Sequence, residues 1–114
     1  MTETRLQIML EFIYENYSKK INLLDIASAA KVSKSEALRC FKEGVNISPV
    51  DYLNRYRLNV AKKLLLSTDN TIAEISSQVG YDNVGYFDRL FKQAFDVTPN
   101  QLRKRKINKN SFSC

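Results

Sequence analysis

The sequence predicts an all-α protein of seven helices, in which two helix-turn-helix subdomains are joined by a long linker helix. The chain has only three glycines and two prolines among 114 residues, and apolar residues recur at helical spacing. One pattern also occurs twice: Arg39 and Phe41 align with Arg89 and Phe91 at an offset of 50. A repeat of this length is typical of a duplicated supersecondary unit.

The first copy contains three expected helices. Apolar spacing predicts a helix over residues 4–17, and an asparagine cap followed by an acidic residue favours a second helix over 23–30. Ser33 with Glu36 predicts a capping box, in which each residue bonds the backbone of the other, at the start of a third helix over 34–43.

Four more helices follow. Ser48-Pro49 predicts the start of a long helix over 49–67, because proline at the first helical position loses no hydrogen bond. The remaining helices are expected to open at Thr71 and end at Gly80, to be capped by Asp82-Asn83 and run to about residue 95, and to start at Thr98-Pro99.

These elements predict four segments. Residues 1–48 form the first helix-turn-helix subdomain, 49–67 the linker helix, 68–106 the second helix-turn-helix subdomain and 107–114 a disordered basic tail. The repeat offset is 49 upstream and 50 downstream, so the second copy should have one extra residue in the turn before its second helix. Lys31 occupies the position of Gly80 in the first copy, so we expect that turn to be strained or differently shaped.

Composition indicates an anionic partner. Lys and Arg number 18 against 12 Asp and Glu, which gives a net charge of +6, and nucleic acid fits this balance better than an acidic membrane surface. Two cysteines and no histidine support neither a disulfide framework nor a metal site, and they favour a reducing cytoplasm. We therefore expect no cofactor, no metal and no enzymatic activity. Cys40, Phe41 and Phe91 are predicted to be core residues.

The chain resembles the DNA-binding domain of the AraC/XylS family of bacterial transcription regulators over about residues 22–103. The resemblance is carried by Leu24-Asp25-Ile26-Ala27, Ser33, Arg39, Phe41-Lys42, Ser48-Pro49, Tyr52-Leu53, Tyr56-Arg57-Leu58, Ile75, Val79-Gly80-Tyr81-Asp82-Asn83, Tyr86-Phe87, Arg89, Phe91-Lys92 and Thr98-Pro99. It implies that the third and sixth helices enter successive major-groove segments of double-stranded DNA, and that the protein activates transcription by recruiting RNA polymerase. The family usually adds a sensing or dimerisation domain, which we expect to be absent from this chain.

Exposed positions before the buried phenylalanines are the expected base contacts. An arginine can bond guanine O6 and N7, an acidic side chain either caps its helix or accepts from cytosine, and Leu38 either contacts a thymine methyl or packs. Asp88 would repel phosphate unless it orients Arg89 or accepts from cytosine. The predicted base contacts are Ser35, Glu36, Leu38, Arg39, Val84, Gly85, Asp88 and Arg89.

Residues near helix ends and on the flanks are expected to contact DNA phosphates. They are Ser33, Lys34, Lys42, Asn83, Tyr86, Lys92 and Arg103. One alternative is a helical protein-protein adaptor without DNA binding, which lacks strongly salt-dependent affinity for duplex DNA. A second is a DNA-acting enzyme, for which neither cysteine has a convincing activating environment.

Overall fold

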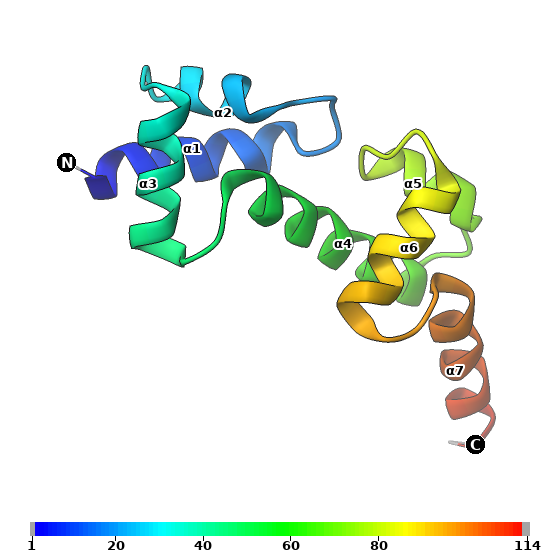
Figure 1. Cartoon of the computed structure of the whole chain (residues 1–114). Helices are drawn as coiled ribbons and strands as arrows, with labels where there is room; N and C mark the ends of the chain where they lie inside the picture. The colour runs from blue at the N-terminus through cyan, green and yellow to red at the C-terminus, as the bar shows by residue number, and fades with distance from the viewer. Residues whose placement is uncertain (1, 113–114) are drawn as a thin grey trace. The chain divides into compact units, whose positions relative to one another are not determined.

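The structure, a computed structural model, describes the backbone of residues 2–112 and the side chains of residues 4–105. Over these residues it contains seven α-helices and no strand (Figure 1), which confirms the predicted all-α class. The helices are α1 (Thr2–Asn16), α2 (Leu23–Ala29), α3 (Lys34–Val45), α4 (Pro49–Ser67), α5 (Ile72–Gln78), α6 (Val84–Phe95) and α7 (Pro99–Phe112). The tail predicted at 107–114 lies outside the residues described in full.

The two copies of the sequence repeat form helices of the same lengths. Helices α2 and α5 have 7 residues each, and α3 and α6 have 12 each. The turn between α2 and α3 comprises residues 30–33, whereas that between α5 and α6 comprises residues 79–83. The extra residue expected in the second turn is therefore confirmed.

Most of the predicted caps are made. Asn22 and Thr71 each form a complete capping box, with Asp25 and Glu74 respectively. The Ser48 hydroxyl accepts from the Asp51 backbone N–H at 3.1 Å, as expected at the start of α4. The side chain of a cap residue accepts the free backbone N–H three positions later, so short sequence patterns are enough to predict these helix starts.

The capping box predicted for Ser33 and Glu36 is wrong in one half. The Ser33 hydroxyl accepts from the Glu36 backbone N–H at 3.1 Å. The Glu36 carboxylate does not return to the Ser33 backbone, because it accepts hydrogen bonds from Arg5 and Arg39 instead. Two guanidinium groups within reach are stronger donors than one backbone amide.

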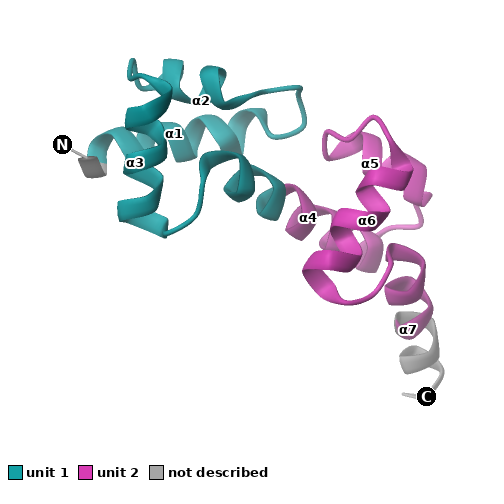
Figure 2. Cartoon of the chain, in the orientation of Figure 1, with its two compact units in different colours: residues 1–56 teal, residues 57–114 magenta. Residues whose placement is uncertain are grey.

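Residues 1–56 form the first compact unit, unit 1 (Figure 2). Its core is supplied by every helix of the unit and consists of Met9, Ile13, Ile26, Ala27, Ala37, Cys40, Phe41 and Leu53. Burying a side chain of the size of phenylalanine or leucine contributes about 1.5–3 kcal/mol. Phe41 and Cys40 are fully buried, so both predictions of a core role are confirmed.

Residues 57–114 form unit 2 (Figure 2). Phe87, Phe91 and Phe95 stack along α6, with ring centroids 5.8 and 4.7 Å apart, and Phe91 is fully buried as predicted. The Arg57 guanidinium lies over the Tyr81 ring, 5.3 Å from its centroid. An aromatic core on α6 therefore leaves the opposite face of this helix to solvent.

The two turns share a left-handed residue. Gly80 has φ 100°, and Lys31 at the equivalent position has φ 57°. A residue with a Cβ pays about 1–2 kcal/mol in this region, whereas glycine enters it freely. The strain expected at Lys31 is therefore confirmed.

The boundary between the units falls within α4, after Tyr56. Leu53 is buried in the core of unit 1, while Ala61 and Leu65 are buried on the other side of the boundary. Each half of α4 therefore completes one unit. No helix in the described part of the chain has the length and apolar character required to cross a bilayer.

Candidate nucleic-acid interface

Helix α3 separates a buried face from an exposed one. Ala37, Cys40 and Phe41 are fully buried, because they recur at the spacing of one helical face. Three of the four predicted base contacts of unit 1 are exposed: Ser35, Leu38 and Arg39. Leu38 is 43% exposed, so it does not pack into the core. Its side chain is available for an apolar contact with a ligand.

Glu36, the fourth predicted contact, is held between two arginines. Its carboxylate accepts from Arg39 Nη2 at 2.6 and 2.7 Å and from Arg5 Nη1 at 2.9 Å. The hydrogen bond from Arg39 lowers the pKa of this carboxyl below its usual value, and the charge of Arg5 acts in the same direction. Glu36 therefore stays ionised and paired at neutral pH.

Helix α6 repeats this division in unit 2. Phe87 and Phe91 are fully buried, whereas Val84 is 36% and Tyr86 45% exposed. Gly85 and Arg89 are also exposed. The Arg89 guanidinium carbon lies 5.8 Å from the centroid of the Tyr86 ring, within the range of a cation–π contact. The predicted contacts of unit 2, Asp88 excepted, share the exposed side of α6.

Asp88 is the exception because it is largely covered. Its Oδ1 is buried and has no hydrogen-bond partner among the described residues. This desolvation raises the pKa of the Asp88 carboxyl above its usual value. Of the two roles considered from the sequence, orienting Arg89 does not occur here, since Arg89 contacts Tyr86 instead.

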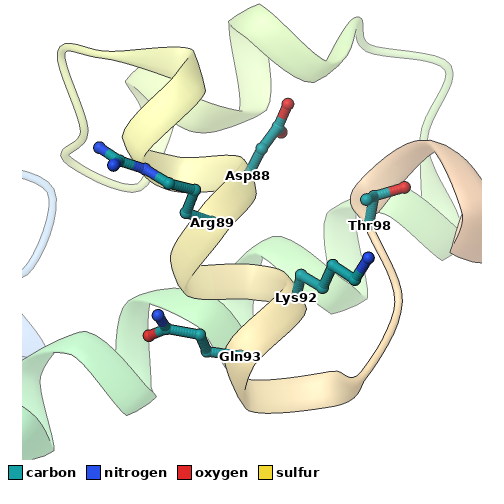
Figure 3. A pocket seen from close by; sticks show the side chains of 5 residues that line it. All are labelled: Asp88, Arg89, Lys92, Gln93 and Thr98. Atoms are coloured by element: carbon teal, nitrogen blue, oxygen red, sulfur yellow. The ribbon is translucent and has the colours of Figure 1, made fainter.

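A hollow of about 420 Å³ lies beside α6 in unit 2. It is lined by Asp88, Arg89, Lys92, Gln93 and Thr98 (Figure 3). Figure 3 shows the Lys92 side chain extending toward Thr98, while the Arg89 side chain extends away from Thr98. Thr98 caps α7, because its hydroxyl accepts from the Gln101 backbone N–H at 3.1 Å. A lysine and the capped N-terminus of α7 therefore meet at this hollow.

Unit 1 has a hollow of about 250 Å³ at the equivalent place. It is lined by Leu38, Lys42, Asn46, Ile47 and Ser48. Leu38, Lys42 and Ser48 are the counterparts of Asp88, Lys92 and Thr98 at the repeat offset of 50. The duplicated units therefore share this surface feature, with a leucine replacing the aspartate.

The residues predicted to contact phosphate occupy three kinds of position. Lys34, Lys42 and Lys92 are exposed. Ser33 and Asn83 cap α3 and α6, since their side-chain oxygens accept backbone N–H groups at 3.1 and 2.9 Å. Tyr86 and Arg103 are already engaged by other protein groups, Tyr86 by Arg89 and Arg103 by the backbone.

Arg103 belongs to α7, and its guanidinium reaches the last turn of α4 and the loop that follows it. Its guanidinium donates to the backbone carbonyls of Leu65 at 3.3 Å, Thr68 at 3.2 Å and Asn70 at 2.5 Å. The last carbonyls of a helix lack intrahelical partners, so a cation at this end is doubly favourable. The structure therefore gives Arg103 a capping role within unit 2.

Sequence reasoning missed Arg5 as a member of the interface. It lies in α1, upstream of the repeated segment, and reaches Glu36 across 31 positions of sequence. A charge pattern within α1 gives no sign of this contact, because it depends on how α1 packs on α3.

Two helix-turn-helix units, each with an exposed arginine on its second helix, define a class of proteins with two nucleic-acid reading helices in one chain. Residues 26–105 match the family described as helix-turn-helix domain. The chain belongs to this family, and to its AraC/XylS-type DNA-binding domains.

Three similar proteins illustrate the match. The chain is 38% identical over 100 residues to the uncharacterized HTH-type transcriptional regulator YdeC of Bacillus subtilis, covering 88% of this chain and 34% of that protein. It is 33% identical over 98 residues to the lactose operon transcription activator of Staphylococcus xylosus, covering 86% and 35%. The C-terminal domain of AraT, a response regulator from Geobacillus stearothermophilus, has a TM-score of 0.85 at 34% identity, covering 89% and 84%. The chain thus spans about a third of the length of these curated relatives.

Proposed function

We propose that this chain binds specific sequences in double-stranded DNA and thereby regulates transcription, with α3 and α6 in successive major-groove segments. The observation that carries the proposal is the pair Arg39 and Arg89, which occupy equivalent exposed positions on two helices of equal length. Arginine is the side chain that most often reads guanine in the major groove, through O6 and N7.

The length of α4 supports two adjacent groove segments. Its 19 residues correspond to about 28 Å at 1.5 Å per residue. One turn of B-form DNA measures roughly 34 Å. The similar size of these two lengths supports the proposal that one continuous helix links readers of adjacent groove segments.

Base reading is assigned to the exposed residues of both helices. Arg39 and Arg89 are proposed to contact guanine, while Leu38 and Val84 offer apolar contacts that suit a thymine methyl group. Ser35 and Gly85 allow close approach of the groove at the helix N-termini. The first unit is expected to contribute more direct readout, because Val84 and Gly85 offer no side-chain hydrogen bonds to bases in the second.

Phosphate contacts are assigned to the exposed lysines. Lys42 and Lys92 line the two equivalent hollows, next to Ser48 and Thr98 at the start of the following helix. Lysine charge and helix N-termini both favour phosphate oxygens. Lys34, together with backbone donors near Ser33 and Asn83, completes the proposed phosphate contacts.

The remaining assignments follow from DNA binding in a bacterium. The family resemblance supports recruitment of RNA polymerase, and binding to bacterial DNA supports a cytoplasmic location. We assign no catalysis to it. Burial raises the pKa of the Cys40 thiol, which is the opposite of what a reactive cysteine needs.

Selection of bound duplexes from a random pool tests the proposal. We expect recovery of sites with two conserved blocks separated by about one DNA turn, and an affinity that falls steeply with salt. Arg39→Ala should relax the preference in one block only. Recovery of no consensus, with weak binding that salt does not affect, would contradict the proposal and favour the protein-protein adaptor.

A further inference from the structure

The side chain three positions before each reading arginine contacts that arginine. In α3 the Glu36 carboxylate accepts two hydrogen bonds from Arg39 Nη2, at 2.6 and 2.7 Å. In α6 the Tyr86 ring lies under the Arg89 guanidinium. Residues three apart share a helix face, so the duplicated spacing places both pairs together. The two units therefore hold equivalent arginines by different chemistry, an ion pair and a cation–π contact.

The ion pair in unit 1 leaves the arginine able to read. The side chain of Arg39 is 62% exposed, whereas that of Glu36 is 22% exposed. Only Nη2 of Arg39 is engaged by the described residues, so the Nη1 hydrogens remain to donate to a guanine acceptor such as N7. The carboxylate is thus the anchored partner and the guanidinium the presented one.

Arg5 extends this arrangement to α1. Its Nη1 donates to Glu36 Oε1 at 2.9 Å, the same oxygen that Arg39 contacts. Glu36 is therefore restrained from two sides, by its own helix and by a neighbouring one. Arg5 also lies outside the segment that matches the helix-turn-helix family, residues 26–105.

Restraining a long side chain favours recognition. Arginine loses much rotamer freedom when it binds a base, and an arginine already held in position loses less. Resting on the proposed DNA-binding function, we propose that Glu36 and Tyr86 are positioning residues for base reading by Arg39 and Arg89, with Arg5 controlling Glu36 from α1. This gives Glu36 and Tyr86 roles other than the base and phosphate contacts expected from sequence.

The Glu36 role is tested with a selected duplex that carries 7-deazaguanine, which lacks the N7 acceptor, at the guanine read by Arg39. That guanine is identified as the one whose replacement lowers the affinity of the wild-type chain but does not change the affinity of the Arg39→Ala variant. The wild-type chain should lose about tenfold in affinity on this replacement. Glu36→Ala should cut that discrimination by about fivefold, while affinity for a random duplex stays the same or rises because a negative charge is gone.

Two further variants keep this test decisive. Glu36→Gln retains the shape of the side chain, so it provides the test if the alanine variant fails to fold. Its discrimination should lie between that of the wild type and that of Glu36→Ala. Arg5→Ala should lower discrimination, although by less than Glu36→Ala does. Gln7→Ala, a control at another exposed position of α1, should leave discrimination unchanged. Circular dichroism verifies that each variant remains helical.

The outcomes separate the two proposals. Full discrimination in both Glu36 variants, with loss of discrimination in Arg39→Ala, overturns the positioning role and leaves DNA reading intact. Discrimination that Arg39→Ala does not alter at any guanine overturns base reading by Arg39, and the positioning role with it.

Tyr86 is tested by separating its ring from its hydroxyl. Tyr86→Phe keeps the ring under Arg89, and Tyr86→Leu removes it. We expect the phenylalanine variant to retain discrimination at the guanine read by Arg89 and the leucine variant to lose about three- to fivefold. Equal losses in both variants would assign the effect to the hydroxyl, and so to a phosphate contact, and would overturn the positioning role.

Discussion

Replacing Arg103 with alanine removes three hydrogen bonds, one to Leu65 in the last turn of α4 at 3.3 Å and two to Thr68 and Asn70 in the loop that follows, at 3.2 and 2.5 Å. A buried hydrogen bond to a charged group contributes about 1.5–3 kcal/mol. Here one part-buried guanidinium serves all three carbonyls, and water can reach them after the change. We therefore expect a loss of about 2–3 kcal/mol in total, which for a unit of this size lowers Tm by roughly 10–20 °C.

Thermal unfolding followed by circular dichroism measures this loss, and DNA affinity at several salt concentrations measures any phosphate contact. A phosphate contact contributes about 0.9 to the slope of log affinity against log salt. Arg103→Ala should lower Tm and leave that slope unchanged, measured where the variant is folded. Arg103→Lys should lose less stability, and Lys104→Ala on the exposed side of α7 should lose none. An unchanged Tm with a slope reduced by about 0.9 would refute the capping role.

Three further perturbations have signs set by the structure. Lys31→Gly should raise the free energy of unfolding by about 0.5–1 kcal/mol, because the strain of a left-handed lysine exceeds the entropic cost of glycine, and Gly80→Lys should lower this free energy. Urea unfolding that shows no change in either variant would contradict the strain at these positions. Asp88→Asn should raise stability at pH 7 by about 1 kcal/mol. The pKa of Asp88 is raised in the folded state, so its protonated carboxyl stabilises the fold, and this contribution is lost as the pH rises through the folded pKa. The stability gained in Asp88→Asn should therefore disappear near pH 3, where the wild-type carboxyl is also uncharged. Lys42→Ala and Lys92→Ala should each weaken binding to every duplex and reduce the salt slope by about 0.9, and a loss confined to one sequence would exclude a phosphate contact.

The helix starts could be predicted because their signals are local. Asn22, Ser48 and Thr71 each bond a backbone N–H three positions along the chain. The buried faces of α3 and α6 were also readable, since Phe41 and Phe91 follow the helical period. At Ser33 the same rule predicted a full capping box, and it failed because a distant arginine competes for the Glu36 carboxylate.

The site was less predictable where side chains depend on tertiary packing. Arg103 belongs to a basic cluster in the sequence, yet its partners lie 33–38 positions earlier. Asp88 occupies a position exposed in the helical pattern, but neighbouring atoms cover its Oδ1. Neither fact follows from periodicity, because both require knowledge of which surfaces meet. The equivalence of the hollows beside Lys42 and Lys92 likewise emerges only in three dimensions.

Because both units include part of α4, the chain cannot be divided into two domains at a loop between them. A break after Tyr56 would end one piece about one turn after buried Leu53 and would begin the other about one turn before buried Ala61, so the helix would fray next to core residues in both pieces. Anyone isolating a single reader should therefore retain all of Pro49–Ser67 in either piece, giving overlapping fragments, 1–67 and 49–114, in place of abutting ones.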